Sequence, residues 1–322
     1  MRIQYRKRAD GVEIVRCYGN DSKVVLPENI EESPVKRVAA YAFSSRKQKE
    51  DQDVLEIETS GSFLSGEREQ LLAGDFIEEI VFPDSVEEIG NYIFYGCREL
   101  RRLSFSDSLM RLGSGAFTGC GKLRYFTVRL RKGQQTCVKE ILGELWQRMD
   151  VVFQKETQSI GLVFPEHYEE AVENTPARIL FTQHHGTGNL YRQCFYDRIL
   201  DYRKYDELFP LALAQDKLQV LVDLVFSRLQ SRYELTIRHQ QIYEAYMREH
   251  LVEITEYLVE GEQIERLQQI SEWKLWTEEA LDVGVQSAAE CKKTELVGVL
   301  MNERHRLLEG KQPAGRKRRF EL

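Results

Sequence analysis

The sequence predicts an α+β protein, in which a solenoid with a short-stranded parallel sheet is followed by an all-α helical-repeat or bundle domain. Two observations carry this prediction. The first half contains a clear internal repeat with alternating apolar residues, and from about residue 138 the apolar spacing changes to a helical one. The length agrees, because 322 residues can bury the core of one large domain or two ordinary ones.

The composition argues against several classes of protein. Only seven residues are proline, which is unusual for a disordered chain, and the net charge of −7 argues against a chain built mainly to bind nucleic acid. No run approaches the roughly 18 apolar residues of a membrane helix, so no membrane insertion is expected. The basic N-terminus is not followed by a continuous apolar stretch, so we expect no secretory signal and a cytoplasmic, reducing setting.

The repeat is clearest in residues 77–99 and 100–122, which align without a gap at a spacing of 23 residues. The alignment matches Phe94 with Phe117 and Cys97 with Cys120. A spacing of this length that carries the pattern LxxLxFxxSL is typical of leucine-rich repeats. Because each coil of a solenoid packs on the next, Phe94 and Phe117 are predicted to stack as a buried column.

The repeat pattern weakens toward the N-terminus. One spacing before the first clear repeat, a degenerate coil is predicted from Val54, Ile57 and Leu71. Earlier still, Phe43 ends a stretch that resembles the end of a repeat, and its distance from Phe94 requires an insertion, which we expect near residues 46–53. Stacked coils of this kind bury one continuous core that a single coil cannot form.

These motifs resemble the BspA-like, treponemal-type leucine-rich repeats of bacteria. The lines SVEEIGNYIFYGCREL (85–100) and SLMRLGSGAFTGCGKL (108–123) carry the resemblance, and residues 11–43 resemble the usual first unit of that family. The resemblance implies a curved solenoid with a parallel sheet on its concave side, used to bind proteins or surfaces. We therefore expect a leucine-rich repeat domain over residues 1–137 and a transition or capping segment over residues 138–165.

The second half is predicted to be a helical domain over residues 166–308, followed by a basic, disordered tail over residues 309–322. Pro165 and Pro176 stand where first-turn prolines are expected. The stretch GVQSAAECKKTELVGVLM (284–301) is similar to the ankyrin pattern AxxxxxxExVxxLL. The residues that match this pattern are Ala288, Glu295, Val297, Leu300 and Met301. An unrelated helical domain with a chance match is the alternative.

The candidate binding site is the concave face of the predicted sheet. Residues that alternate with the buried Ile, Leu and Phe of each strand must face solvent there. On this basis the face carries Glu56, Glu58, Glu79, Val81, Arg102, Ser104, Tyr125 and Thr127. The row across the strands ends in Tyr125, an aromatic residue of the type that anchors interfaces. Because solenoids form extended surfaces rather than closed pockets, the sequence predicts a non-enzymatic scaffold that binds a protein partner through this sheet, the helical surface or both. A merely solvated sheet face is the alternative.

The alternative function is an enzyme with a site in the helical half near His184 and His185. The pair lies in QHHGTGN (183–189), and histidines beside glycines suit a catalytic base or a phosphate-binding turn. A polar turn between helices is the competing interpretation, because neighbouring residues of a regular element point apart. The sequence has no cofactor motif and no metal-ligand spacing, so neither a cofactor nor a metal is expected.

The two aligned cysteines and the basic tail can each be interpreted as functional or as purely structural. Cys97 and Cys120 stand one repeat apart, where a disulfide is geometrically possible, but we expect two buried thiols in an apolar column. The tail cluster Arg316–Arg319 suits contact with nucleic acid or an anionic surface, but a solvated end is favoured because the protein as a whole is acidic.

Overall fold

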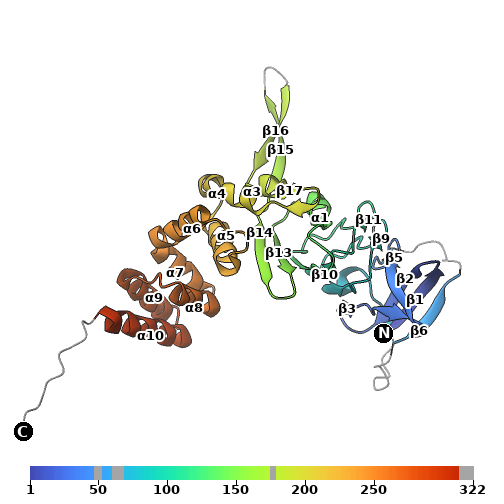
Figure 1. The fold of residues 1–322 in the computed structure, drawn as a ribbon, viewed down its shortest axis with the longest axis horizontal. Helices are drawn as coiled ribbons and strands as arrows, with labels where there is room; N and C mark the ends of the chain where they lie inside the picture. Colours follow the sequence, from blue (N-terminus) through green and yellow to red (C-terminus); the bar gives the residue numbers. More distant parts are fainter. Residues whose placement is uncertain (47–52, 60–68, 175–178, 312–322) are drawn as a thin grey trace, which may run out of the picture. The chain divides into compact units, whose positions relative to one another are not determined.

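The structure is a computed structural model that describes residues 1–46, 53–59, 69–174 and 179–311. It divides into two compact units (Figure 1). The first consists of Met1–Asp216 with Gln230–Glu234, and the second of Lys217–Leu229 with Leu235–Leu322. The first unit contains a β-solenoid and the second is helical, so the predicted α+β class is confirmed. The tail cluster Arg316–Arg319 lies outside the described residues.

A ladder of short strands forms one side of the solenoid. Its order in the described part of the chain is β14-β13-β12-β10-β8-β3, and all neighbours from β3 to β13 are parallel. The antiparallel β14 closes the sheet at one end. The bounds are β3 (Lys23–Val25), β8 (Glu79–Val81), β10 (Arg102–Ser106), β12 (Tyr125–Arg129), β13 (Met149–Gln154) and β14 (Ser159–Phe164).

Equivalent core residues of successive coils lie on top of one another. Ile80, Leu103 and Phe126 occupy aligned positions in three neighbouring strands and are all buried. The rings of Phe94 and Phe117 are 5.6 Å apart between centroids, and both are buried. The predicted phenylalanine column is therefore confirmed. Its physical basis is that each coil leaves an apolar edge that only the next coil can cover.

A second sheet combines the other side of the coils with an N-terminal hairpin. Its order is β11-β9-β5-β2-β1-β6, with β4 pairing to β5 and β7 to β2. The strands β5, β9 and β11 belong to successive coils and are parallel, whereas β1 and β2 form an antiparallel hairpin. The bounds are β1 (Arg2–Arg8), β2 (Gly11–Gly19), β4 (Asn29–Ile30), β5 (Ser33–Val38), β6 (Leu55–Glu58), β7 (Gln70–Leu71), β9 (Glu88–Ile89) and β11 (Arg111–Leu112). A 3-10 turn, η1 (Gly74–Phe76), follows β7.

The prediction of a degenerate coil from Val54, Ile57 and Leu71 is wrong. The strand β3 pairs directly with β8, and the ring of Phe43 stacks on Phe94 at 5.6 Å, so the coil that ends at Phe43 is the immediate neighbour of the coil that contains Phe94. The strands β6 and β7 instead pair antiparallel with β1 and β2. Phe43 and Phe94 are 51 residues apart, so the stretch between Phe43 and β8 contains an insertion of 51 − 23 = 28 residues, longer than expected.

The first unit continues beyond the repeats with small capping elements. Their bounds are α1 (Val138–Glu144), α2 (Gly188–Arg192), β17 (Phe195–Tyr196), β18 (Ile199–Leu200), α3 (Tyr202–Glu207) and α4 (Phe209–Gln215). Arg192 is the buried centre of this region, because its guanidinium donates to several backbone carbonyls, among them Leu142 at 3.2 Å, Gln147 at 2.8 Å and Gly188 at 3.0 Å. Burial lowers the pKa of Arg192 to about 10.

An antiparallel hairpin, β15 (Tyr168–Asn174) with β16 (Ile179–His185), stands where the first helices of the second half were expected. Figure 1 shows it projecting from the capping elements of its unit. The prediction of helices directly after residue 166 is wrong here, because seven residue pairs form a two-stranded ladder. Pro165 precedes a strand rather than a helix, and Pro176 lies outside the described residues.

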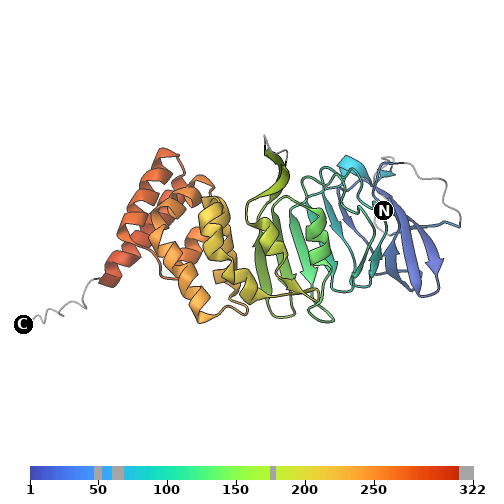
Figure 2. The same ribbon diagram turned by 90° about the horizontal axis from the view of Figure 1, so that it is seen from above.

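The second unit is helical, as predicted. Its helices are α5 (Leu218–Ser231), α6 (Ile237–Glu249), α7 (Leu251–Glu260), α8 (Ile264–Glu272), α9 (Glu278–Glu290) and α10 (Thr294–Lys311). Thr236 and Thr277 begin α6 and α9 as N-caps whose hydroxyls accept backbone hydrogen bonds. The helix α9 packs against both α7 and α10 (Figure 2, orange to red). Whether these helix pairs are ankyrin repeats stays a prediction.

Candidate functional site

The candidate site is the outward face of the strands β3, β8, β10, β12 and β13, which we call the ladder face. Its first row runs across the strands through Glu79, Arg102 and Tyr125, which are direct partners in the parallel pairing. Its second row contains Val81, Ser104 and Thr127. These six residues alternate with buried ones along each strand, so their predicted position on one face is confirmed.

The predicted position of Glu56 and Glu58 on this face is wrong. Both lie on β6, which pairs with β1 in the other sheet, where Glu56 accepts hydrogen bonds from Arg2 and Gln4. The strand beside β8 is β3, so Lys23 and Val25 occupy the two places. A sequence signal for this was available, because Leu26 and Pro27 follow β3 as Phe82 and Pro83 follow β8.

The ladder face also extends one strand further than the sequence analysis predicted. Asp150 and Val152 on β13 pair with Tyr125 and Thr127 and continue the two rows. The alternation of MDVVFQ (149–154) is the signal that identifies them. The completed first row thus contains Lys23, Glu79, Arg102, Tyr125 and Asp150, so charged side chains flank one tyrosine.

The centre of the first row is a cation–π pair. The guanidinium carbon of Arg102 lies 4.5 Å from the centroid of the Tyr125 ring, and that of Arg124 lies 5.4 Å from it. Tyr125 remains 38% exposed despite these contacts. At this distance an arginine is attracted by the negative face of the ring, and this attraction holds the side chains of Arg102 and Tyr125 together.

The carboxylates of the ladder face are bound by its cations. Lys23 Nζ lies 2.9 Å from Glu79 Oε1, and Asp150 Oδ2 accepts from Arg124 Nε at 2.7 Å. Arg148 Nε donates to the other oxygen of Asp150 at 2.9 Å.

Asp84, which follows β8, shows the same arrangement at the other end of the strands. It accepts from Arg129 Nε at 2.6 Å and from Arg131 Nε at 2.9 Å. Burial raises the pKa of this carboxyl group, but the hydrogen bonds from Arg129 and Arg131 outweigh it and lower the pKa overall. Asp84 is therefore ionised at neutral pH.

The histidine pair proposed as a catalytic site lies at the end of β16, so the expected turn between helices is wrong. The ring of His185 stacks on Tyr168 at 4.3 Å, and its Nε2 lies 3.2 Å from Glu170 Oε2. The side chain of His184 lies outside the described residues.

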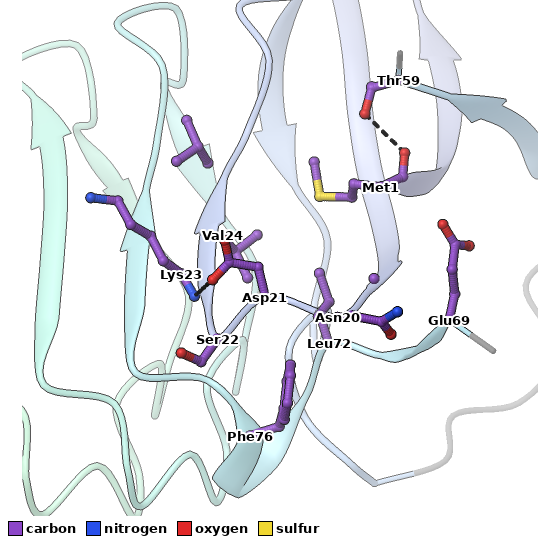
Figure 3. A pocket seen from close by; sticks show the side chains of 12 residues that line it. Met1, Asn20, Asp21, Ser22, Lys23, Val24, Thr59, Glu69, Leu72 and Phe76 are labelled. Atoms are coloured by element: carbon purple, nitrogen blue, oxygen red, sulfur yellow. Dashed lines mark hydrogen bonds between the residues drawn. The ribbon is translucent and has the colours of Figure 1, made fainter. Parts of the chain in front are cut away.

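Two hollows are lined by residues other than Arg102 and Tyr125. One, of about 770 Å³, lies beside β3 and is lined by Met1, Ser22, Lys23 and Phe76, among others (Figure 3). The other, of about 680 Å³, lies in the second unit and is lined by Trp276 and by residues of α8 and α10. Within the described ranges, no three His, Cys, Asp or Glu side chains gather as metal ligands, and no helix is long and apolar enough to cross a membrane.

Cys97 and Cys120 are buried free thiols, as predicted. The thiol of Cys97 donates to the carbonyl of Phe43 at 3.2 Å, and that of Cys120 donates to the carbonyl of Phe94 at 3.4 Å. Burial raises the pKa of Cys97 to about 12 and that of Cys120 further still. Both thiols therefore stay protonated and unreactive at neutral pH.

Comparison with known proteins identifies the repeats. Residues 69–161 match the family described as BspA type leucine rich repeat region, in six copies. No curated protein matches the chain. A leucine-rich cell surface protein from Faecalibacterium prausnitzii is 19% identical, with 41% of this chain and 36% of that chain covered and a TM-score of 0.26. A leucine-rich repeat protein from T. pallidum is 24% identical, with coverages of 42% and 73% and a TM-score of 0.19. This chain thus spans only about a third of the length of the first protein.

Proposed function

Because residues 69–161 are a leucine-rich repeat region of the BspA type, we propose that the protein is a non-enzymatic scaffold that binds a protein partner through the ladder face. Stacked repeats form an extended open surface rather than a closed pocket, which suits a macromolecular ligand. The observation that carries the proposal is the exposed pair of Arg102 and Tyr125 at the centre of the first row. Tyrosine and arginine are the residue types that most often dominate binding energy.

The surroundings of the pair support this role. Ser104 and Thr127 lie beside it in the second row and are small enough to let a partner approach the sheet. The contact between Arg102 and Tyr125 fixes both side chains before binding, so little rotational freedom has to be lost when a partner arrives. The helical surface of the second unit is the second candidate for binding, with the hollow at Trp276 as its main feature.

A catalytic role near His184 and His185 has no comparable support. The ring of His185 is occupied by its contacts with Tyr168 and Glu170, and it lies on a projecting hairpin (Figure 1). We also propose a cytoplasmic, reducing setting, which is supported by Cys97 and Cys120 being free thiols at equivalent positions of successive repeats.

The test is quantitative binding of a partner captured from the native cell lysate. The double change Arg102→Glu with Tyr125→Ala is expected to weaken binding by at least about 2 kcal/mol, roughly 30-fold. The matched control is Arg203→Glu with Tyr196→Ala, which makes the same chemical changes at exposed positions of the capping elements. Unaltered affinity of the first variant would exclude the ladder face and make the helical surface the candidate.

A further inference from the structure

The ladder face carries a surplus of positive charge on an acidic protein. Its charged residues and their ion-pair partners comprise six cations and three carboxylates. The cations are Lys23, Arg102, Arg124, Arg129, Arg131 and Arg148, and the carboxylates are Glu79, Asp84 and Asp150. The surplus of three positive charges is opposite in sign to the net charge of −7 of the whole chain. A surface of this kind attracts an anionic partner.

The pairing shows which cation is available. Lys23 is bound to Glu79, and the other two carboxylates are each shared by two arginines. Within the part of the chain that the structure describes, these pairs leave only Arg102 without a carboxylate among the six. Arg102 is exposed, and it stands between Glu79 and Tyr125 in the first row.

The geometry prepares Arg102 to receive a carboxylate. Its guanidinium lies over the Tyr125 ring, which holds the side chain without using the charge in an ion pair. The planar edge of a guanidinium can donate two parallel hydrogen bonds to one carboxylate, and such pairs are among the stronger polar contacts.

Resting on the proposed function, we propose that the partner segment bound by the ladder face is an acidic peptide, and that one of its carboxylates pairs with Arg102. Arg124 and Arg148 at Asp150, and Arg129 and Arg131 at Asp84, supply further positive potential around that contact. These groups are held by their own carboxylates, so they attract an acidic segment without each needing a ligand group.

A nucleic acid fits this face less well. A single strand needs aromatic faces on which bases can stack, but guanidinium groups lie against the ring of Tyr125. A phosphate backbone also needs a continuous row of cations, whereas Glu79 and Asp150 interrupt the first row on both sides of the central pair. Alternating charges of this kind match the spaced acidic side chains of a peptide.

The experiment measures binding of the full chain to three labelled probes by fluorescence anisotropy at low salt. The probes are an oligoglutamate peptide, an oligoglutamine peptide of equal length and a single-stranded oligonucleotide. We expect oligoglutamate to bind at least about tenfold more tightly than oligoglutamine, and the difference to shrink as salt screens the charges. Equal affinity for the two peptides would overturn the proposal, and preferential binding of the oligonucleotide would replace it with nucleic-acid recognition.

Substitutions at Arg102 and Tyr125, with a control on α3, locate the contact. Arg102→Gln, which removes the charge but keeps a polar side chain, should weaken oligoglutamate binding about tenfold, whereas Arg203→Gln on α3 should leave it unchanged. Tyr125→Leu removes the ring below Arg102 and should also bind oligoglutamate less well. Full oligoglutamate affinity in the Arg102→Gln variant would overturn the assignment.

Failure of this inference is distinguishable from failure of the proposed function. In one outcome, the double variant of Arg102 and Tyr125 no longer binds the captured partner, but Arg102→Gln binds oligoglutamate with full affinity. This result would mean that the ladder face binds a ligand that is not an acidic peptide. A partner that binds the double variant normally would mean instead that the ladder face is not the binding site.

Discussion

In both the repeat coils and the helical unit, a glycine lies where a neighbouring element leaves no room for a Cβ atom. The neighbouring atoms belong to the backbone in the coils and to side chains in the helical unit. A Cβ atom at Gly113 would lie 2.2 Å from the backbone nitrogen of Asn91 in the preceding coil. A Cβ atom at Gly284 in α9 would lie 2.7 Å from Cγ2 of Thr255 in α7 and 3.2 Å from Cδ1 of Leu300 in α10. The coils therefore meet backbone against backbone, whereas the helices meet through side chains that can move.

This difference decides what repeats in the sequence. Gly90 has the same relation to Ala40 that Gly113 has to Asn91, with a Cβ-to-nitrogen distance of 2.2 Å, because each coil repeats the geometry of the last. A backbone contact accepts only glycine, so the residue recurs at a fixed spacing. A contact between side chains can be satisfied by many combinations, so the helical unit leaves a much weaker pattern in its sequence.

The largest expected effect is the loss of a ring from the phenylalanine column. Phe117→Ala should destabilise the protein by about 3 to 5 kcal/mol, as truncations of buried phenylalanine do. Phe94→Ala should cost at least as much, because Phe94 has ring neighbours on both sides, Phe43 and Phe117. Chemical denaturation measures both, and a loss below about 1 kcal/mol would show that the column does not support the solenoid.

The two glycines provide the next test of the comparison. Gly113→Ala should cost about 1 to 3 kcal/mol or more, because backbone atoms of the neighbouring coil cannot step aside. Gly284→Ala should cost less, since Thr255 and Leu300 can shift and alanine favours the helix by about 0.5 to 1 kcal/mol. Gly143→Ala in α1, where the added Cβ meets nothing within 4 Å, is the control. Equal costs at Gly113 and Gly284 would remove the distinction between the two regions.

The spacing of 23 residues predicted the regular coils, including the strands β8, β10 and β12, because each of these repeats the contacts of its neighbour. It failed between Phe43 and β8, where an insertion breaks the spacing and the apolar residues of β6 imitate a coil while pairing with β1. Any method that reads fixed spacing has this weakness, since β6 and a repeat strand share the same alternation of residues.

The candidate site was predicted in part for the same reason. Arg102 and Tyr125 were found because alternation along a strand assigns each residue to a face. The side chains that form ion pairs around the site were missed. Asp84 and Arg131 lie outside the strands, where alternation does not apply, and the pairing between them joins positions 47 residues apart. The hairpin that carries His185 was missed because prolines and apolar runs in its sequence also suit helix starts.

Thiol chemistry should differ between the two units. In the native protein at pH 8, only Cys291 in the helical unit should react readily with a thiol reagent, because it is exposed while Cys17, Cys97, Cys120, Cys137 and Cys194 are buried. Under denaturing, non-reducing conditions, six thiols should react. Four reactive thiols after denaturation, with Cys97 and Cys120 protected together, would indicate a disulfide between the coils.

The same burial predicts how stability depends on alkaline pH. The pKa of Cys97 is about 12 in the folded protein, compared with about 8.5 for a thiol in an unfolded chain. The folded state therefore holds its proton over a range in which the unfolded state releases it. The contribution of the protonated Cys97 to the free energy of unfolding is therefore complete below about pH 8.5 and is lost as the pH rises toward 12. The slope of unfolding free energy against pH should become less steep in Cys97→Ala, and an unchanged slope would contradict the assignment.

The smallest expected effect on stability is at the proposed binding residues themselves. A double-mutant cycle on Arg102→Ala and Tyr125→Ala should give a coupling of about 0.5 to 1 kcal/mol, because an exposed cation–π pair contributes no more than that. Surface substitutions of this kind change the free energy of unfolding little, in contrast to those at Phe94. A decrease in the free energy of unfolding as large as that of Phe94→Ala would place the pair in the core. Weaker partner binding could then no longer be separated from unfolding. With a small loss, reduced affinity of the same variants reports on the ladder face alone.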